Sequence, residues 1–121
     1  MRTSDGERWT FPKGRQERGE TLAQTAAREA EEEAGVVGVA DEDPLIEYRH
    51  APSRHAKRAD DAVAAFLLTI QSVGPSGEHD RDPTWFDLET ARDRLAEGRE
   101  IVYARELERV LAAAKRELQR R

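Results

Sequence analysis

The chain has 121 residues, which suits one domain over residues 1–121. It contains no cysteine, so disulfides and thiolate metal ligands are excluded, and no apolar run approaches the roughly 20 residues that span a bilayer. The net charge of −5 argues against nucleic acid as a partner. Without a signal-like N-terminus, we expect a cytoplasmic protein with no membrane partner.

The first half of the chain predicts a short strand, a loop, a helix and two further strands, over residues 8–11, 13–19, 21–34, 36–40 and 45–49. The helix prediction rests on both of its ends. Thr21 and Gln24 have the spacing of a capping box, and Gly35 is a favoured C-terminal cap. A stripe of small apolar residues at steps of four would let this helix lie close against a sheet.

The second half predicts a basic loop, an apolar strand, a second loop and two helices, over residues 51–61, 63–70, 72–83, 88–97 and 104–120. The strand at 63–70 is almost continuously apolar, so we expect it to be central and buried on both faces. The last helix has an amphipathic pattern and is expected to cover the sheet, although its apolar stripe also suits a docking partner.

Three glutamates share one face of the predicted helix. Glu29, Glu32 and Glu33 stand at positions i, i+3 and i+4, where like charges repel unless a cation lies among them. Hard oxygen ligands without Cys or His indicate Mg²⁺ or Mn²⁺, which could neutralise phosphate charge and activate a water. The alternative is an acidic helix face that is simply solvated.

The spacing around these glutamates resembles the signature of the Nudix hydrolase family. Over residues 14–36 the chain has Gly, five residues, Glu, seven residues, Arg-Glu, two residues, Glu-Glu, one residue, Gly and an aliphatic residue. The seven matching positions are Gly14, Glu20, Arg28, Glu29, Glu32, Glu33 and Gly35. Two segments outside the motif are also similar to the family: residues 9–14, which lead from Trp9 into the motif, and residues 85–91, which begin at Trp85. The resemblance therefore extends over most of the chain.

The resemblance implies an α/β (α+β) fold, an α/β/α sandwich around a mixed β-sheet. It also implies roles for the residues of the motif. Glu29 and Glu33 would be the principal metal ligands, and Glu32 a further ligand or the general base. The Gly14 carbonyl would be another ligand. Arg28 and Glu20 would form an orienting pair beside the catalytic groups, with an ordinary surface ion pair as the alternative.

The N-terminal part is shorter than the family pattern. Nudix domains ordinarily carry further strands before the tryptophan, whereas only residues 1–8 precede Trp9 here. We therefore expect an N-terminally short sheet whose unpaired edges pair with a second copy, giving a homodimer or an exchanged arrangement.

The expected substrate is a phosphorylated small molecule. The sequence Pro12-Lys13-Gly14 resembles the diadenosine polyphosphate and diphosphoinositol polyphosphate branch of the family. Basic side chains on the loop at the start of the motif and in the segment from residue 49 to 58 would bind phosphates through charge-assisted hydrogen bonds. These candidates are Lys13, Arg15, Arg49, Arg54, His55, Lys57 and Arg58. A solvated basic loop is the alternative for the segment from residue 49 to 58.

Three functions stay open from the sequence. The first is hydrolysis of a phosphoanhydride bond in a dinucleoside or diphosphoinositol polyphosphate by metal-activated water. The second is a pyrophosphatase of nucleoside triphosphates or nucleotide sugars. The third is a Nudix-fold module that binds a nucleotide without turnover, and the intact glutamates of the motif argue against it.

Overall fold

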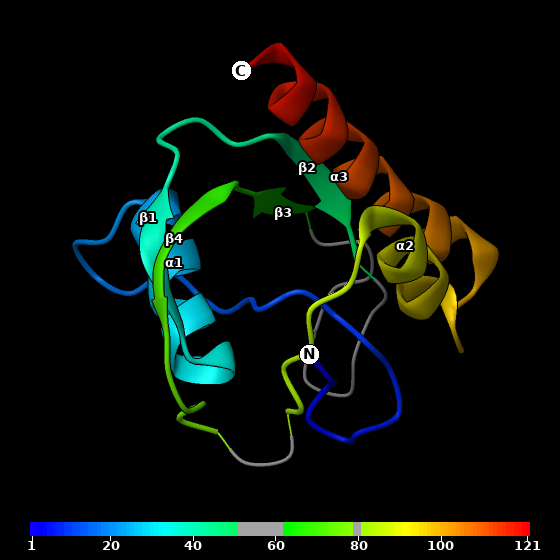
Figure 1. Cartoon of the computed structure of the whole chain (residues 1–121), viewed down its shortest axis with the longest axis horizontal. Coiled ribbons are helices and arrows are strands. Elements are labelled where there is room, and N and C mark those ends of the chain that lie inside the picture. The colour runs from blue at the N-terminus through cyan, green and yellow to red at the C-terminus, as the bar shows by residue number, and fades with distance from the viewer. Residues whose placement is uncertain (51–61, 79–80) are drawn as a thin grey trace.

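A computed structural model gives the structure of the chain and describes residues 1–50, 62–78 and 81–121 (Figure 1). Its helices are α1 (Leu22–Ala34), α2 (Leu88–Ala96) and α3 (Ile101–Arg120). Its strands are β1 (Val36–Ala40), β2 (Ile46–Arg49), β3 (Ala62–Ala65) and β4 (Leu68–Val73). Helices and antiparallel strands together make an α+β fold, as predicted.

Helix α1 begins and ends where its caps predict. The Thr21 hydroxyl accepts a hydrogen bond from the Gln24 N–H at 3.1 Å, and the Gln24 side chain accepts one from the Thr21 N–H at 2.9 Å. Gly35 follows in the left-handed conformation with φ of 71°, and its N–H returns to the helix. These two caps fix the helix in register, and with it the three glutamates on its surface.

The strands form two antiparallel pairs and not one mixed sheet. In one pair β1 runs against β4, and in the other β2 runs against β3. At residues 8–11, where a strand is predicted, the described residues contain only a single bridge between Arg2 and Trp9. Among the described residues each strand therefore has one hydrogen-bonded neighbour and one open edge.

The prediction of one central strand over residues 63–70 is wrong. The segment divides at Phe66 and Leu67, so that β3 pairs with β2 and β4 pairs with β1. It is not buried on both faces either, since Ile70 of β4 remains 42% exposed. An apolar run predicts that a segment is extended, but its burial depends on which neighbours reach it.

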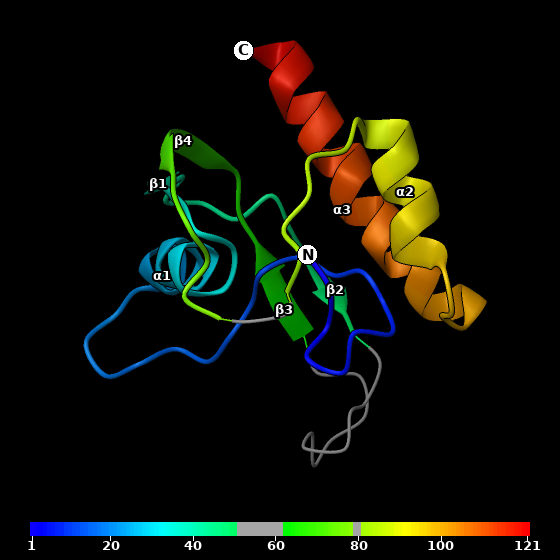
Figure 2. The same ribbon diagram turned by 60° about the horizontal axis from the view of Figure 1, so that its bottom comes forward.

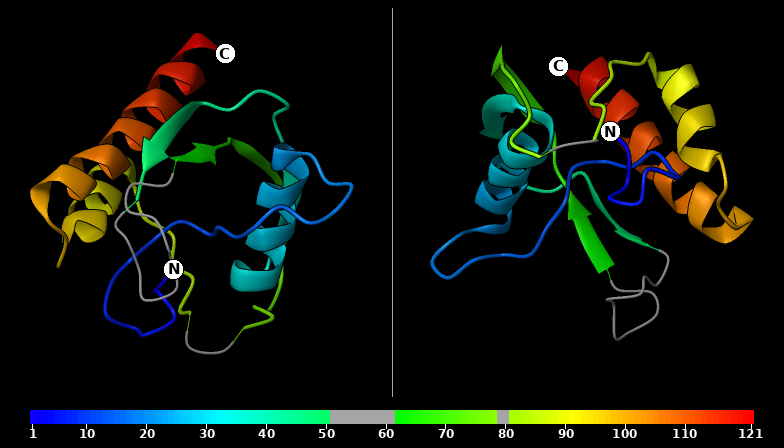
Figure 3. Two further views of the ribbon diagram at one scale, coloured as in Figure 1. Left: turned by 180° about the vertical axis from the view of Figure 1, so that it is seen from behind. Right: turned by 90° about the horizontal axis from the view of Figure 1, so that it is seen from below.

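The two strand pairs belong to two halves of the molecule (Figures 2 and 3). Helix α1 packs on β1, whereas α3 packs on β2 and against α2. The buried core lies mainly in the second half and consists of Trp9, Tyr48, Leu95, Leu107 and Val110. Trp9 reaches it from the N-terminal segment and contacts Phe86 edge to face, with ring centroids 5.1 Å apart. The half of the molecule formed by α1, β1 and β4, which carries the motif, contributes little to this core.

The two C-terminal helices follow their predicted patterns. Helix α2 begins after Asp87, whose carboxylate accepts the Thr90 N–H, and α3 begins at residue 101, three residues earlier than predicted. Burial of Leu107 and Val110 on α3 confirms that its apolar stripe faces the protein. No helix in the described ranges is long and apolar enough to cross a membrane.

Candidate active site

The motif is built from the loop before α1 and from one face of that helix. The loop passes Gly14 directly over the Glu29 side chain. A Cβ atom at Gly14 would lie 2.2 Å from the Glu29 carboxylate carbon. Only glycine lets the backbone approach the carboxylate this closely.

Arg28 ties the loop to the helix with all five of its guanidinium donors. Its Nε and Nη2 bond the two oxygens of Glu20 at 2.7 and 3.1 Å, and Nη2 also bonds the Arg15 carbonyl at 3.0 Å. Its Nη1 bonds Glu29 at 2.8 Å and Glu32 at 3.1 Å. A bidentate arginine–carboxylate pair of this kind fixes direction as well as distance. Part of the repulsion on the acidic face is therefore relieved within the chain.

The electrostatics of this network follow from these contacts. Hydrogen bonds from Arg28, and then from the Glu17 N–H, lower the pKa of Glu20 to about 2. The Glu20 carboxylate in turn raises the pKa of Arg28 above its ordinary value. Both groups stay charged across the physiological range, so the loop remains clamped to the helix at any ordinary pH.

Glu33 is the most enclosed carboxylate of the motif, with its side chain 5% exposed. Its Oε1 accepts the Lys13 N–H at 3.0 Å, and its Oε2 lies 3.0 Å from Nη2 of Arg81. Burial and a hydrogen bond shared with Glu29 raise the pKa of Glu33 above its usual range, although Arg81 opposes the shift. Two carboxylates in contact are costly when both are charged, so the pair favours either a proton or a cation.

The donor set fits a divalent cation only in part. Glu29 and Glu33 bring two carboxylates together beside Gly14, which is the hard-oxygen chemistry that Mg²⁺ and Mn²⁺ prefer. Within the described ranges no group of three or more acidic or histidine side chains gathers as a ready cage. Glu32 instead turns to Arg28 and is half-exposed. Magnesium binds through one or two carboxylates and keeps several waters, so two ligands suffice.

A loop distant in sequence completes the site, and no local pattern predicted this. The N–H groups of Gly74 and Gly77 and the hydroxyl of Ser76 bond the last carbonyls of α1, on Gly35, Glu32 and Glu33. The same loop carries Arg81 to the Glu33 carboxylate. Glycines and a proline at 72–83 predict a loop, but its docking onto α1 is a tertiary contact that single-sequence patterns do not encode.

The candidate phosphate-binding residues are not all brought to the motif. Lys13 and Arg15 are exposed on the loop before α1. Arg49 lies at the end of β2, and there its N–H bonds Glu106 of α3 at 3.0 Å. Arg54, His55, Lys57 and Arg58 lie outside the described residues.

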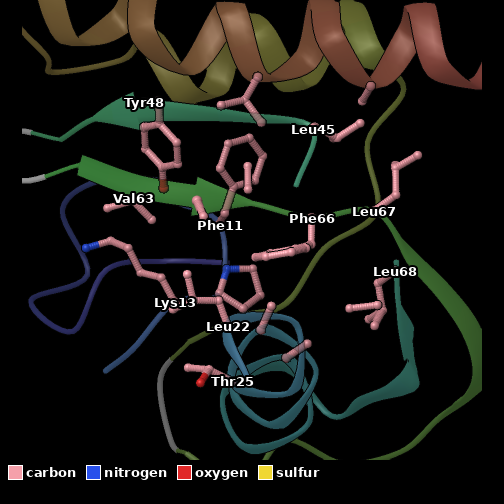
Figure 4. A pocket seen from close by; sticks show the side chains of 18 of the residues that line it. Phe11, Lys13, Leu22, Thr25, Leu45, Tyr48, Val63, Phe66, Leu67 and Leu68 are labelled. Atoms are coloured by element: carbon pink, nitrogen blue, oxygen red, sulfur yellow. The ribbon is translucent and has the colours of Figure 1, made fainter. Parts of the chain in front are cut away.

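An apolar cavity of about 510 Å³ adjoins the motif. Figure 4 shows Phe11, Phe66 and Leu22 between the β2–β3 strands and α1, in the space that separates the two halves. Lys13 and Gly14 form part of the same wall. Trp85 is 67% exposed at this cavity. A ligand held at Glu29 and Glu33 would therefore have an apolar surface next to it.

The chain is similar to a known protein family. Residues 1–105 match the NUDIX domain family, which covers most of the chain and includes the whole carboxylate motif. The chain belongs to the Nudix family. Its membership rests on the match over residues 1–105 and not only on the 23 residues of the motif, 14 to 36.

One curated relative shows how far the likeness extends. Nudix hydrolase 13, mitochondrial, of Arabidopsis thaliana is 33% identical over an alignment of 90 residues, which covers 67% of this chain and 44% of the plant protein. This Nudix domain thus spans less than half the length of that relative. No solved structure matches the chain significantly.

Proposed function

We propose that this Nudix domain is a Mg²⁺- or Mn²⁺-dependent hydrolase of phosphoanhydride bonds. The observation that carries the proposal is that the Glu29 and Glu33 carboxylates both lie against the same turn of the loop, one at Gly14 and the other at the Lys13 N–H. Two neighbouring carboxylates in a mostly buried setting are stabilised by a cation, and a phosphorylated substrate needs such a cation to neutralise its charge. The relative's name, a Nudix hydrolase, supports the same activity.

Each residue of the motif has a role in this proposal. Glu29 and Glu33 would hold the cation, with the Gly14 carbonyl as a further ligand, and Glu32 would be the general base, with metal ligation as its alternative role. When bound, the cation supplies charge neutralisation and a water of lowered pKa. Glu32, whose Oε2 is held by Arg28 at 3.1 Å, would accept the proton of the attacking water on Oε1. Arg28 and Glu20 keep the loop and the helix face aligned.

The preferred substrate is a dinucleoside polyphosphate, with diphosphoinositol polyphosphate as the other member of the same branch. Lys13 and Arg15 are placed on the loop that borders Glu29, where they would contact phosphates. The apolar cavity beside Lys13 and Gly14 supports a substrate with an aromatic base next to its phosphates. An inositol polyphosphate carries phosphates around its ring and has no apolar group for this surface.

A hydrolysis screen tests the proposal. The purified chain is incubated with Mg²⁺ and, separately, diadenosine polyphosphates, diphosphoinositol phosphates, nucleoside triphosphates and a nucleotide sugar, and the products are separated by anion exchange. We expect cleavage of a dinucleoside polyphosphate that stops when the metal is chelated. Cleavage of triphosphates or nucleotide sugars alone would favour the second candidate. Tight binding of a nucleotide with no cleavage of any substrate would favour a binding module.

We also propose that the chain forms a homodimer. In the part of the chain that the structure describes, both strand pairs have open edges, and Val39 and Val73 of the β1–β4 pair are more than half-exposed. Sedimentation equilibrium should give twice the mass of the chain, and a monomer at micromolar concentration would contradict this proposal. A cytoplasmic location remains a prediction, since the plant relative is named as mitochondrial.

A further inference from the structure

Arg81 occupies the carboxylate that the proposed function assigns to the metal. Its Nη2 lies 3.0 Å from Oε2 of Glu33, and neither side chain is open to solvent, with exposures of 16% and 5%. The other oxygen of Glu33 accepts the Lys13 N–H at 3.0 Å. Both oxygens of Glu33 are therefore already in contact with a donor.

These two donors differ in how easily they can leave. The Lys13 N–H belongs to the backbone of the loop that Arg28 clamps, so it is fixed in place. Arg81 reaches Glu33 from the end of a long and flexible side chain. Its Nε also bonds Glu78 at 2.8 Å, and its Nη1 bonds the Arg2 carbonyl at 3.2 Å. These outer partners would hold the guanidinium at the rim after it left Glu33.

A guanidinium and a divalent cation cannot share Oε2 of Glu33 at low cost. Magnesium coordinates oxygen at about 2.0–2.1 Å, which would bring it close to the Nη2 atom of Arg81. Positive charges this close repel strongly where water is largely excluded. Conversely, a buried carboxylate with no positive partner is destabilising, so the metal-free chain needs Arg81 on Glu33.

We propose that Arg81 is a resident counter-ion of Glu33, which a divalent cation displaces when it binds. This inference rests on the proposed metal site at Glu29 and Glu33. In the metal-free protein Arg81 keeps the Glu33 carboxylate ordered beside Lys13. Metal binding replaces one positive partner by another, and the apparent affinity for the cation is reduced by the contact that must be broken.

Titration of the metal-free protein with Mn²⁺ by calorimetry tests this inference. We expect R81Q to bind Mn²⁺ at least about tenfold more tightly than the wild type, since a charged hydrogen bond contributes roughly 1.5–3 kcal/mol and 1.4 kcal/mol is tenfold. The matched control is R94Q. Arg94 also forms an arginine–glutamate ion pair, with its Nη1 atom 2.7 Å from Oε1 of Glu97, but this pair is exposed. The affinity of R94Q should stay within about twofold, because exposed ion pairs contribute little.

The outcomes separate the inference from the proposed site. Equal or weaker Mn²⁺ binding by R81Q would overturn the counter-ion role, while wild-type binding that is lost in E33Q would leave the metal site standing. No Mn²⁺ binding by the wild type, or equal binding by E33Q, would instead reject the site itself.

A second variant and a second measurement cover the case in which R81Q folds poorly. R81K keeps the charge but lacks the planar fork that contacts Glu33 and Glu78 together. Its affinity for Mn²⁺ should lie between those of the wild type and R81Q. In thermal unfolding, saturating Mn²⁺ should raise the Tm of R81K more than that of the wild type, because tighter binding stabilises more at a given metal concentration. An equal rise in Tm would contradict the inference.

Discussion

Helix α1, which carries the glutamates, forms as its sequence predicts. The apolar segment at residues 63–70 does not. Helix α1 forms where its caps predict, and Arg28 finds its partners within the same motif. The apolar segment divides between two sheets and leaves Ile70 42% exposed. The helix and the Arg28 network of the motif are thus specified locally, whereas the pairing and burial of the apolar segment depend on distant contacts.

The comparison separates polar contacts between residues near each other in the sequence from burial that depends on residues far away. Charged and capping contacts in the motif join residues that lie within about one loop and one helix of each other. Burial of a strand requires that other elements cover both of its faces. The predictions below separate the two regions, beginning with the largest expected effect.

The motif should carry the activity. Glu33→Gln removes one charge from the contacting pair and should lower kcat/KM by at least about a hundredfold, since even outer-shell partners of a metal cost 10- to 100-fold. The matched control is Glu31→Gln on the same helix, where the side chain is exposed. It should retain nearly full activity in a metal-dependent hydrolysis assay. Equal losses in both variants would reject a localised site.

The two apolar regions should differ in stability. Leu107→Ala in the buried core should lower the free energy of unfolding by roughly 2–5 kcal/mol. Ile70→Ala should cost less than about 1.5 kcal/mol, because much of that side chain is already in contact with solvent. Urea unfolding monitored by circular dichroism measures both. An effect of Ile70→Ala as large as that of Leu107→Ala would indicate that another element or a second copy covers β4.

Gly35 lies between the end of α1 and the start of β1. An added Cβ would lie 2.2 Å from the Gly74 carbonyl oxygen, and the φ of 71° already disfavours other residues. Gly35→Ala should therefore destabilise the domain by about 2 kcal/mol or more. Gly6 is the matched control, since its φ of 76° is similar but nothing lies near its Cβ position. Gly6→Ala should cost about 1 kcal/mol, and equal losses would mean that the close approach to Gly74 is unimportant.

The smallest effect should come from Glu106, which joins α3 to β2. Hydrogen bonds from Arg109, and then from the Arg49 N–H, lower the pKa of this carboxyl below its unfolded value. The stabilisation is therefore fully present above about pH 5 and is lost as the pH falls through the lowered pKa. Glu106→Gln should lower the free energy of unfolding at pH 7 by about 1 kcal/mol. The difference from the wild type should shrink below pH 4, and a constant difference would contradict the assigned contacts.

The sequence predicted the part of the site that is contiguous. Thr21 and Gly35 identified the ends of α1, and the spacing of the glutamates identified their shared face. The resemblance to the Nudix family, confirmed over residues 1–105, supplied the reaction class.

The remaining features depend on tertiary contacts. Arg81 and Ser76 reach α1 from a loop far along the chain, and no local pattern records that approach. The division at Phe66 and the exposure of Trp85 also depend on which elements reach these residues. Apolar composition alone predicted burial over residues 63–70, and the exposure of Ile70 shows that this was wrong.

The most direct test of the central claim follows the oxygen of the attacking water. Diadenosine tetraphosphate is incubated with the protein and Mg²⁺ in ¹⁸O-enriched water, and the products are analysed by mass spectrometry. Attack of water on phosphorus at the Glu29–Glu33 site predicts one ¹⁸O atom in one of the two products, and labelled product that forms at least about a hundredfold more slowly with Glu33→Gln. Unlabelled products, or labelling at the same rate with Glu33→Gln, would contradict the account.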